Sequence, residues 1–355
     1  MMCSGHFYAS YSLWTVSELF RAFKFLWPTL LTLVLIGWIV AREVIPAVIR
    51  VQRRASVGQQ IYESGPAAHL AKQGTPTMGG IAFPLAALAA AVYLETAKGW
   101  GGLYFSVSLV GAAAAIGFVD DYLNIKRRTA IGLRAGAKML LLIIVAAIAA
   151  HGFTSAAPEN CAPSFSIGND QWWFGGMFYL PPVWYYILAI TAVVGCANGV
   201  NLTDGVDGLA ASVALPPLIL LSFLDGGGIG LAVAAAVVVF LRYNAHPAKV
   251  FMGDTGSLAL GALIAILAIK LHLLLFLPLV GIVFVIEVLS VIAQVVSFKL
   301  TGKRIFKMSP LHHHFELSGW SEQRITRTFA IVSFLAAAIT YAFIYSANVR
   351  VMGHW

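Results

Sequence analysis

The run Met252-Gly-Asp-Thr-Gly-Ser-Leu-Ala-Leu-Gly-Ala-Leu-Ile-Ala-Ile-Leu-Ala-Ile-Lys270 joins an acidic, Gly-rich turn to a long apolar segment. No residue between Asp254 and Lys270 is charged. A helix that crosses the hydrocarbon core of a bilayer needs about 20 predominantly apolar residues. The run therefore predicts a membrane-spanning helix that opens beside a carboxylate.

The composition of the whole chain has the same character. Of its 355 residues, 59% are hydrophobic and only 11% are Asp, Glu, Lys or Arg, whereas a soluble globular protein has roughly 25% charged residues. A soluble enzyme and a disordered chain are both excluded. With no compositional shift along the chain, we expect one all-α integral membrane domain over 1–355. About ten apolar segments predict its membrane helices, near 26–46, 78–97, 103–119, 134–151, 183–200, 207–224, 229–244, 256–272, 275–298 and 327–347.

Lysine and arginine residues are unevenly divided between alternate loops. With the N-terminus placed outside, 17 of the 23 lie in inward loops and five in outward loops, and Arg42 completes the count. Because cytoplasmic loops carry an excess of these residues, both termini are expected on the periplasmic side. One outward segment, 152–182, is long and carries paired tryptophans, which favours an interfacial loop with aromatic anchors.

Five of the seven Asp residues fall in inward loops, within three short motifs rich in Gly and Asn. Asp120 and Asp121 are expected to end the third helix, and Asp204 and Asp207 are three apart, on one side if the turn is helical. Asp254 precedes a helix whose free N–H groups suit phosphate. Any one Gly–Asp turn is more often a helix cap. Three such motifs on one membrane face favour a functional site. Their oxygen ligands indicate Mg²⁺ or Mn²⁺ rather than Zn²⁺.

Two further inward segments and one carboxylate within an apolar segment complete the unusual features. The segment 74–80, Gly-Thr-Pro-Thr-Met-Gly-Gly, follows Lys72 and alone reads as loop and cap chemistry. The segment 309–316 holds three consecutive histidines. Three consecutive side chains do not all face one small ion, so phosphate or hydroxyl binding is favoured over a metal site. Glu287 lies within an apolar segment, where internal pairing or a groove-facing position is favoured over proton relay.

Together these motifs resemble the polyprenyl-phosphate N-acetylhexosamine-1-phosphate transferases over roughly residues 45–347. The Asp pair and the segments 201–208 and 251–257 are typical of the superfamily, and 74–80 and 309–316 of its phospho-N-acetylmuramoyl-pentapeptide transferase branch. The resemblance implies that phospho-N-acetylmuramoyl-pentapeptide passes from its UDP donor to undecaprenyl phosphate, giving lipid I and UMP. It implies Mg²⁺, with Mn²⁺ as a substitute, and a cytoplasmic-facing site in a bacterial inner membrane. No nucleic-acid partner is expected, and a homodimer is compatible with the lipid-facing apolar residues.

The resemblance also implies roles for individual residues. Asp254 matches the Mg²⁺ ligand, Asp120 a base that deprotonates or orients the lipid phosphate, and Asp121 a support for metal or phosphate geometry. In a two-step alternative, Asp254 is instead the nucleophile of a phospho-enzyme. His313 and His314 are expected among the catalytic groups. The expected substrate contacts are Lys72, Thr77, Asn201, Asp204, Asp207, Asn244 and Phe251 for the nucleoside, His312 for the phosphate and sugar, and Lys126 and Lys138 for phosphate.

One departure from the family pattern and two alternative functions qualify this interpretation. Members commonly carry Lys three residues after the Asp pair, where this chain has Asn124, so the cation expected there is lost or shifted to Lys126. A transferase using UDP-N-acetylglucosamine is one alternative, against which the histidine triplet argues. A secondary transporter with Glu287 as its coupling residue is the other, but transporters usually place several polar groups at the midplane.

Overall fold

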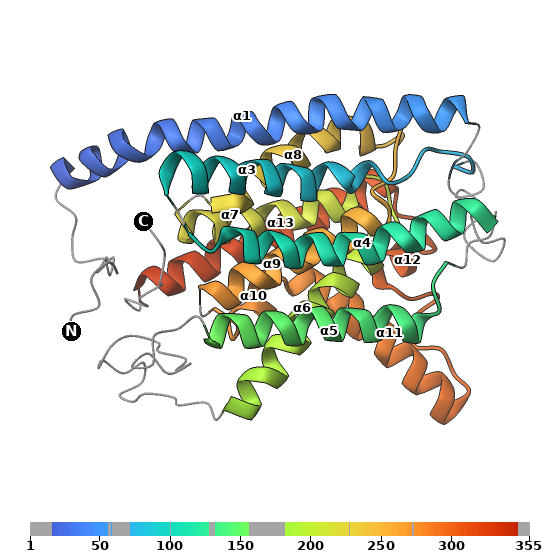
Figure 1. Ribbon diagram of the computed structural model, residues 1–355. Helices are drawn as coiled ribbons and strands as arrows, with labels where there is room; N and C mark the ends of the chain where they lie inside the picture. The colour runs from blue at the N-terminus through green and yellow to red at the C-terminus, as the bar shows by residue number, and fades with distance from the viewer. Residues whose placement is uncertain are drawn as a thin grey trace.

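The computed structural model describes residues 16–55, 58, 72–99, 101–127, 132–155, 182–226, 228–271 and 273–346. These residues form helices and loops without a strand, which confirms the all-α class. Long helices run side by side in one bundle (Figure 1). The helices are α1 (Val16–Arg54), η1 (Gly79–Ile81), α3 (Ala82–Lys98), α4 (Leu103–Arg127), α5 (Ala135–Ser155), α6 (Pro182–Thr203), α7 (Leu209–Leu224), α8 (Gly228–Asn244), α9 (Gly253–Lys270), α10 (Leu277–Val280), α11 (Ile282–Thr301), α12 (Leu311–Glu316) and α13 (Glu322–Ser346).

Eight helices in the described ranges are long and apolar enough to cross a membrane. Two more, α7 and α8, are apolar but have only 16 and 17 residues. Each of these ten helices coincides with a predicted segment. The protein is therefore a multi-pass, all-α membrane protein, and the number of crossings stays a prediction.

Two predicted helix boundaries are wrong. Asp120 and Asp121 do not end their helix, because α4 continues to Arg127; no Gly or Pro follows the pair, and Asn124 bonds back to Asp120 one turn earlier. The predicted helix 275–298 is two helices, α10 and α11, separated at Gly281. Pro278 lies in the first turn of α10, the part of a helix that tolerates proline, and α10 ends after four residues at Gly281. Most of the predicted interfacial loop, 156–181, lies outside the described residues.

The helix α9 is the centre of the bundle. Every residue from Thr255 to Ile269 is buried, and α9 packs mainly against α4 and α6. Small residues allow these close approaches. A Cβ at Gly261 would lie 2.3 Å from the Cys196 carbonyl oxygen of α6, and a Cβ at Gly117 on α4 would lie 2.1 Å from the Asp254 carbonyl oxygen. The first turn of α9 is thereby fixed between its neighbours.

Replacing Gly261 with valine is expected to destabilise the bundle without touching the acidic loops. The added side chain cannot fit against the α6 backbone, so α6 and α9 must separate, and overpacking of this kind costs about 1–3 kcal/mol. Thermal unfolding of the purified variant in detergent measures the loss. A melting temperature equal to that of the wild type would show that the helices are not in this contact.

Candidate active site

Asp254 lies in the first turn of α9, where donors from two other helices meet it. One carboxylate oxygen accepts a hydrogen bond from Asn201 Nδ2 on α6 at 2.6 Å, and the other accepts one from the Lys138 ammonium on α5. Asn201 Nδ2 also lies 2.9 Å from Ser257 Oγ, one turn further along α9. The structure thus brings Lys138 and Asn201, two residues predicted from separate segments, to the carboxylate of Asp254.

Lys138 links Asp254 to the first residue of the Asp pair. Its Nζ lies 3.0 Å from Asp120 Oδ1. The same Asp120 oxygen accepts the Leu133 backbone N–H at 2.9 Å, and its other oxygen accepts Asn124 Nδ2 at 3.1 Å. Asn124 therefore serves as a neutral donor to Asp120 at the position where a cation is typical, and the cation beside Asp120 is Lys138.

Asp121 faces a different partner from its neighbour. One oxygen accepts the Asp254 backbone N–H at 3.0 Å, and the other accepts the Thr255 backbone N–H at 2.9 Å and the Thr255 hydroxyl at 2.7 Å. These are free donors at the start of α9, which has no intrahelical partners for its first N–H groups. The Asp121 side chain thus caps α9 from α4 and fixes the backbone of Asp254.

Asp204 is the acidic residue of the site whose carboxylate has no hydrogen-bond or ion-pair partner among the described residues. It lies in turns rather than in a continuing helix, so the condition under which Asp204 and Asp207 would share one side of a helix is not met. Burial of this carboxyl and the nearby charges of Asp254, Asp121 and Asp207 raise its pKa well above 3.8. An unpaired carboxylate beside other carboxylates, with oxygen donors only, fits a hard divalent cation.

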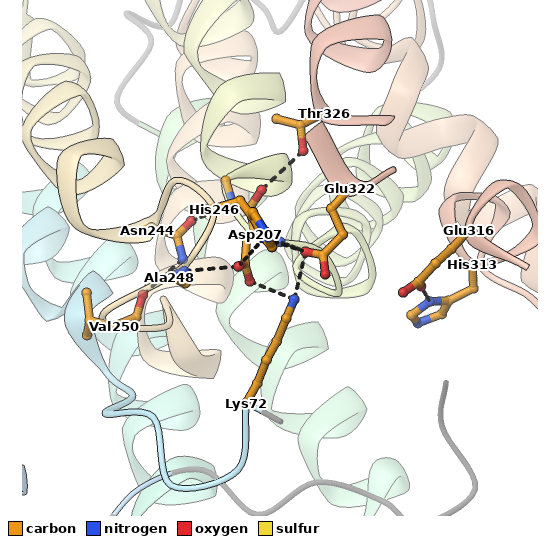
Figure 2. A network of polar contacts seen from close by, with 11 residues as sticks. Lys72, Asp207, Asn244, His246, Ala248, Val250, His313, Glu316, Glu322 and Thr326 are labelled. Carbon is orange, nitrogen blue, oxygen red and sulfur yellow. Dashed lines mark hydrogen bonds and ion pairs between the residues drawn. The ribbon is translucent and has the colours of Figure 1, made fainter. Parts of the chain in front are cut away.

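A second cluster joins three loops and the first turn of α13 (Figure 2). The Lys72 ammonium lies 2.8 Å from Asp207 Oδ1 and 2.7 Å from Glu322 Oε2. His246 Nδ1 lies 3.1 Å from Asp207 Oδ2, which also accepts the Ala248 backbone N–H. The ligand atoms of Asp207, His246 and Glu322 are close enough together to hold a metal ion. In the structure, however, the Lys72 ammonium is the cation that binds both carboxylates.

Backbone hydrogen bonds hold the glycine-rich loop 74–80 against the segment before α9. The Phe251 backbone N–H donates to the Pro76 carbonyl at 2.8 Å, and Gly79 N–H donates back to the Phe251 carbonyl at 2.9 Å. On the other side, the Gln52 side-chain amide of α1 pairs with both backbone groups of Thr77, each at 2.8 Å. The loop therefore has a defined conformation at the edge of the site.

Asn244 is buried and connects two of the acidic motifs. Its Oδ1 accepts the Gly208 backbone N–H at 3.1 Å, and its Nδ2 donates to the Val250 carbonyl at 3.0 Å. Its amide thus holds the loop that carries Asp207 against the loop that leads to Phe251. In this structure Asn244 therefore positions both loops through their backbone groups.

The three histidines lie on the short helix α12 and take three separate partners. His312 is fully buried: its backbone N–H donates to Glu287 Oε1 at 3.2 Å, and its Nδ1 lies 3.3 Å from Glu287 Oε2. His313 Nδ1 lies 3.0 Å from Glu316 Oε2, and His314 Nδ1 accepts the Lys307 backbone N–H at 3.1 Å. Glu287 is thus paired internally, and the triplet does not converge on one ion.

The neighbours of Gly205 connect the histidines to the Asp204 turn. A Cβ at Gly205 would lie 2.4 Å from His312 Nε2 and 3.3 Å from His313 Nε2. By contrast, Lys126 does not join either cluster, since its exposed ammonium lies 5.8 Å from the Tyr122 ring centroid. Several contributing side chains were not predicted: Gln52, His246, Thr255, Ser257 and Glu322. For Glu322 the local signal is an acidic residue in the first turn of α13, where a negative charge is favourable.

Comparison with known proteins agrees with this arrangement. A model of Glycosyl transferase family 4 matches residues 103–272, and phospho-N-acetylmuramoyl-pentapeptide-transferase signature 1 matches residues 72–83. These two matches include the Lys72 loop, the Asp pair and Asp254.

Curated relatives extend the likeness over most of the chain. Phospho-N-acetylmuramoyl-pentapeptide-transferases of Clostridium botulinum (strain Eklund 17B / Type B) and Clostridium perfringens (strain 13 / Type A) are 42% and 44% identical over 322 and 328 residues. The alignments cover 88% and 89% of this chain and 96% and 98% of those proteins. The enzyme of the same name from Shouchella clausii is 42% identical over 320 residues. The chain belongs to the phospho-N-acetylmuramoyl-pentapeptide-transferase family.

Proposed function

We propose that the Asp254 site transfers phospho-N-acetylmuramoyl-pentapeptide from its UDP donor to undecaprenyl phosphate, giving lipid I and UMP. The family makes the chain a phosphoglycosyl transferase of peptidoglycan biosynthesis. The observation that carries the proposal for this site is the meeting of Asp254, Lys138, Asp120 and Asn201 from four helices at one end of the bundle. Two anionic phosphates require such a combination of a cation, fixed donors and a metal site.

Asp254 and Asp204 are the residues that we assign to Mg²⁺. Asp254 keeps capacity for a metal, because a carboxylate has about four acceptor positions and two of them are used here. Asp204 has no described partner and its raised pKa falls when a cation approaches. Bound Mg²⁺ would neutralise phosphate charge and stabilise the leaving UMP.

Lys138 and Asp120 are the residues that we assign to the lipid phosphate. Asp120 is bound by Lys138, the Leu133 N–H and Asn124, so both of its oxygens are held by donors. This supports the orienting role rather than proton abstraction, since a phosphate is already mostly ionised near neutral pH. Lys138 then supplies the positive charge between the two carboxylates and the incoming phosphate.

We place the site on the cytoplasmic side of a bacterial inner membrane. The described part of α1 begins, and that of α13 ends, at one end of the bundle, and α12 lies at the other (Figure 1). The cationic loops lie at the α12 end, which supports a cytoplasmic site and periplasmic termini. A water-soluble nucleotide donor reaches the site from that side.

A donor comparison tests the proposed function. Purified protein with undecaprenyl phosphate and Mg²⁺ is given UDP-N-acetylmuramoyl-pentapeptide or UDP-N-acetylglucosamine, and UMP and lipid product are measured. We expect both products from the muramoyl donor alone. Lipid product formed only from UDP-N-acetylglucosamine would assign the chain to the other branch. Substrate uptake into vesicles without UMP release would indicate a transporter.

Raising the pH is expected to destabilise the cation-free protein through Asp204. Its pKa in the folded state is raised above 3.8, so above that pH the folded state holds a proton that the unfolded state has lost. Stability then falls as pH rises. Melting temperatures in chelator between about pH 5 and about pH 8 should fall more steeply for the wild type than for Asp204→Asn. Mg²⁺ should restore the wild type at high pH, and identical slopes for the two proteins would contradict this.

A further inference from the structure

The first turn of α13 binds the loop that carries Asp207. Glu322 and Thr326 are four residues apart and so share one face of the helix. Glu322 Oε2 accepts the Asp207 backbone N–H at 3.3 Å, and the Thr326 hydroxyl donates to the Asp207 carbonyl at 3.1 Å. The two side chains therefore fix Asp207 from α13, although 115 residues separate Asp207 from Glu322.

Glu322 also binds the Lys72 ammonium, which Asp207 binds from the other side (Figure 2). The three side chains are largely withdrawn from water, with exposed fractions of 16% for Lys72, 2% for Asp207 and 12% for Glu322. Burial lowers the pKa of Lys72, but the hydrogen bonds to Asp207 and Glu322 outweigh it, and the net shift is upward. Lys72 therefore stays protonated at every working pH.

The charges of this cluster decide what Lys72 can bind. Asp207 and Glu322 both face the Lys72 ammonium and, unlike Asp254 beside Lys138, neither is assigned to Mg²⁺, so the charge of Lys72 stays compensated and a phosphate would meet no net attraction there. A lysine ammonium has three N–H donors. Two are used by Asp207 and Glu322, and one is left for an uncharged acceptor.

We propose that Glu322 is a positioning residue for the nucleoside of the donor. With Asp207 it holds Lys72 in place and compensates its charge, so that Lys72 donates to a carbonyl oxygen of the nucleobase rather than binding phosphate. The inference rests on the proposed function, because it assumes a UDP-linked donor in the site. Glu322 touches neither Asp254 nor Lys138, so its effect is on donor affinity.

The variant Glu322→Gln keeps the side-chain volume and an acceptor for the Asp207 N–H but removes the charge. We expect the KM for the UDP donor to rise about tenfold, because the charge-assisted hydrogen bond that holds Lys72 becomes a weaker neutral one. The kcat and the KM for undecaprenyl phosphate should change less than about twofold. A loss of kcat with an unchanged donor KM would overturn the proposal.

A double-mutant cycle with Lys72→Met tests whether Glu322 acts through Lys72. If it does, adding Glu322→Gln to Lys72→Met changes the UMP affinity less than about twofold. If the double variant instead loses UMP affinity by the product of the two single losses, the proposal is overturned. The comparison variant Thr326→Val removes the other α13 contact to Asp207 without changing charge, and we expect a loss of UMP affinity several times smaller than that of Glu322→Gln. An effect as large as that of Glu322→Gln would show that only α13 docking matters.

Competition by uridine and by UMP tests the nucleobase assignment. Lys72→Met should weaken both competitors by the same factor, because the contact is to the base. A loss confined to UMP would make Lys72 a phosphate-binding cation and overturn the proposal. Wild-type protein that releases no UMP from the donor would instead contradict the proposed function itself. An active wild type without coupling between Glu322 and Lys72 would contradict this inference alone.

Discussion

Asp254→Asn is expected to abolish transfer while the protein still folds. Asp254 accepts from Lys138 and Asn201 in the structure. The amide that replaces it carries no charge and points an NH₂ group at one of these donors. Because the proposed Mg²⁺ and phosphate sites both include this carboxylate, the loss of kcat should be at least about 10²–10³-fold. Initial rates of UMP release from the purified variant measure it.

Two checks separate this effect from misfolding. The capping bonds at the start of α9 use the backbone N–H of residue 254, which asparagine retains. The variant should therefore elute as the wild type does on size exclusion and melt within a few degrees of it. Activity within about tenfold of the wild type would remove Asp254 from the site.

Asp121→Ala is expected to cause the second large loss, in stability as well as activity. The side chain accepts three hydrogen bonds from the start of α9. Each buried donor left without an acceptor costs about 1–3 kcal/mol. The first turn of α9 should then fray, which moves Asp254 away from Lys138. Thermal unfolding and UMP release measured on the same preparation report the two losses together.

The conservative variant Asp121→Asn distinguishes capping from direct chemistry. Asparagine keeps one acceptor oxygen, so it should restore part of the lost melting temperature and, in proportion, part of the activity. A fully stable Asp121→Ala protein with no activity would show that Asp121 acts on substrate or metal and not as a cap of α9.

Much of the fold could be predicted from the apolar segments, because a membrane helix needs a long uncharged run wherever it lies in the chain. The segment around Asp254 is an example, since its helix begins within three residues of the predicted start. The separation of α10 from α11 was harder, because both are apolar and only Pro278 and Gly281 mark the change.

The divergence of Asp120 and Asp121 could not be predicted from their adjacency. Neighbouring residues on a helix point about 100° apart. Once α4 continues through the pair, one side chain faces Lys138 and the other the start of α9. The rotation of α4 against α9 decides which of the two Asp residues faces Lys138 and which faces α9. Contacts such as that of Gly117 with Asp254 set this rotation.

The pairing of Lys72 with Glu322 could not be predicted from local sequence patterns either. Glu322 lies 250 residues from Lys72, and it meets the ammonium only because α13 packs against α7 beside the Asp207 turn. Composition and spacing report the kinds of side chain that a site requires. The pairing between distant segments is a property of helix packing.

The most direct test of the account is UMP release by the purified wild-type protein as Mg²⁺ is added to a metal-free reaction with UDP-N-acetylmuramoyl-pentapeptide and undecaprenyl phosphate. We predict no UMP without the cation, saturable release with it, one lipid product for each UMP, and no release from Asp254→Asn at any Mg²⁺ concentration. UMP release at the full rate in chelator, or from Asp254→Asn, would contradict the assignment of a metal-dependent transferase site to Asp254.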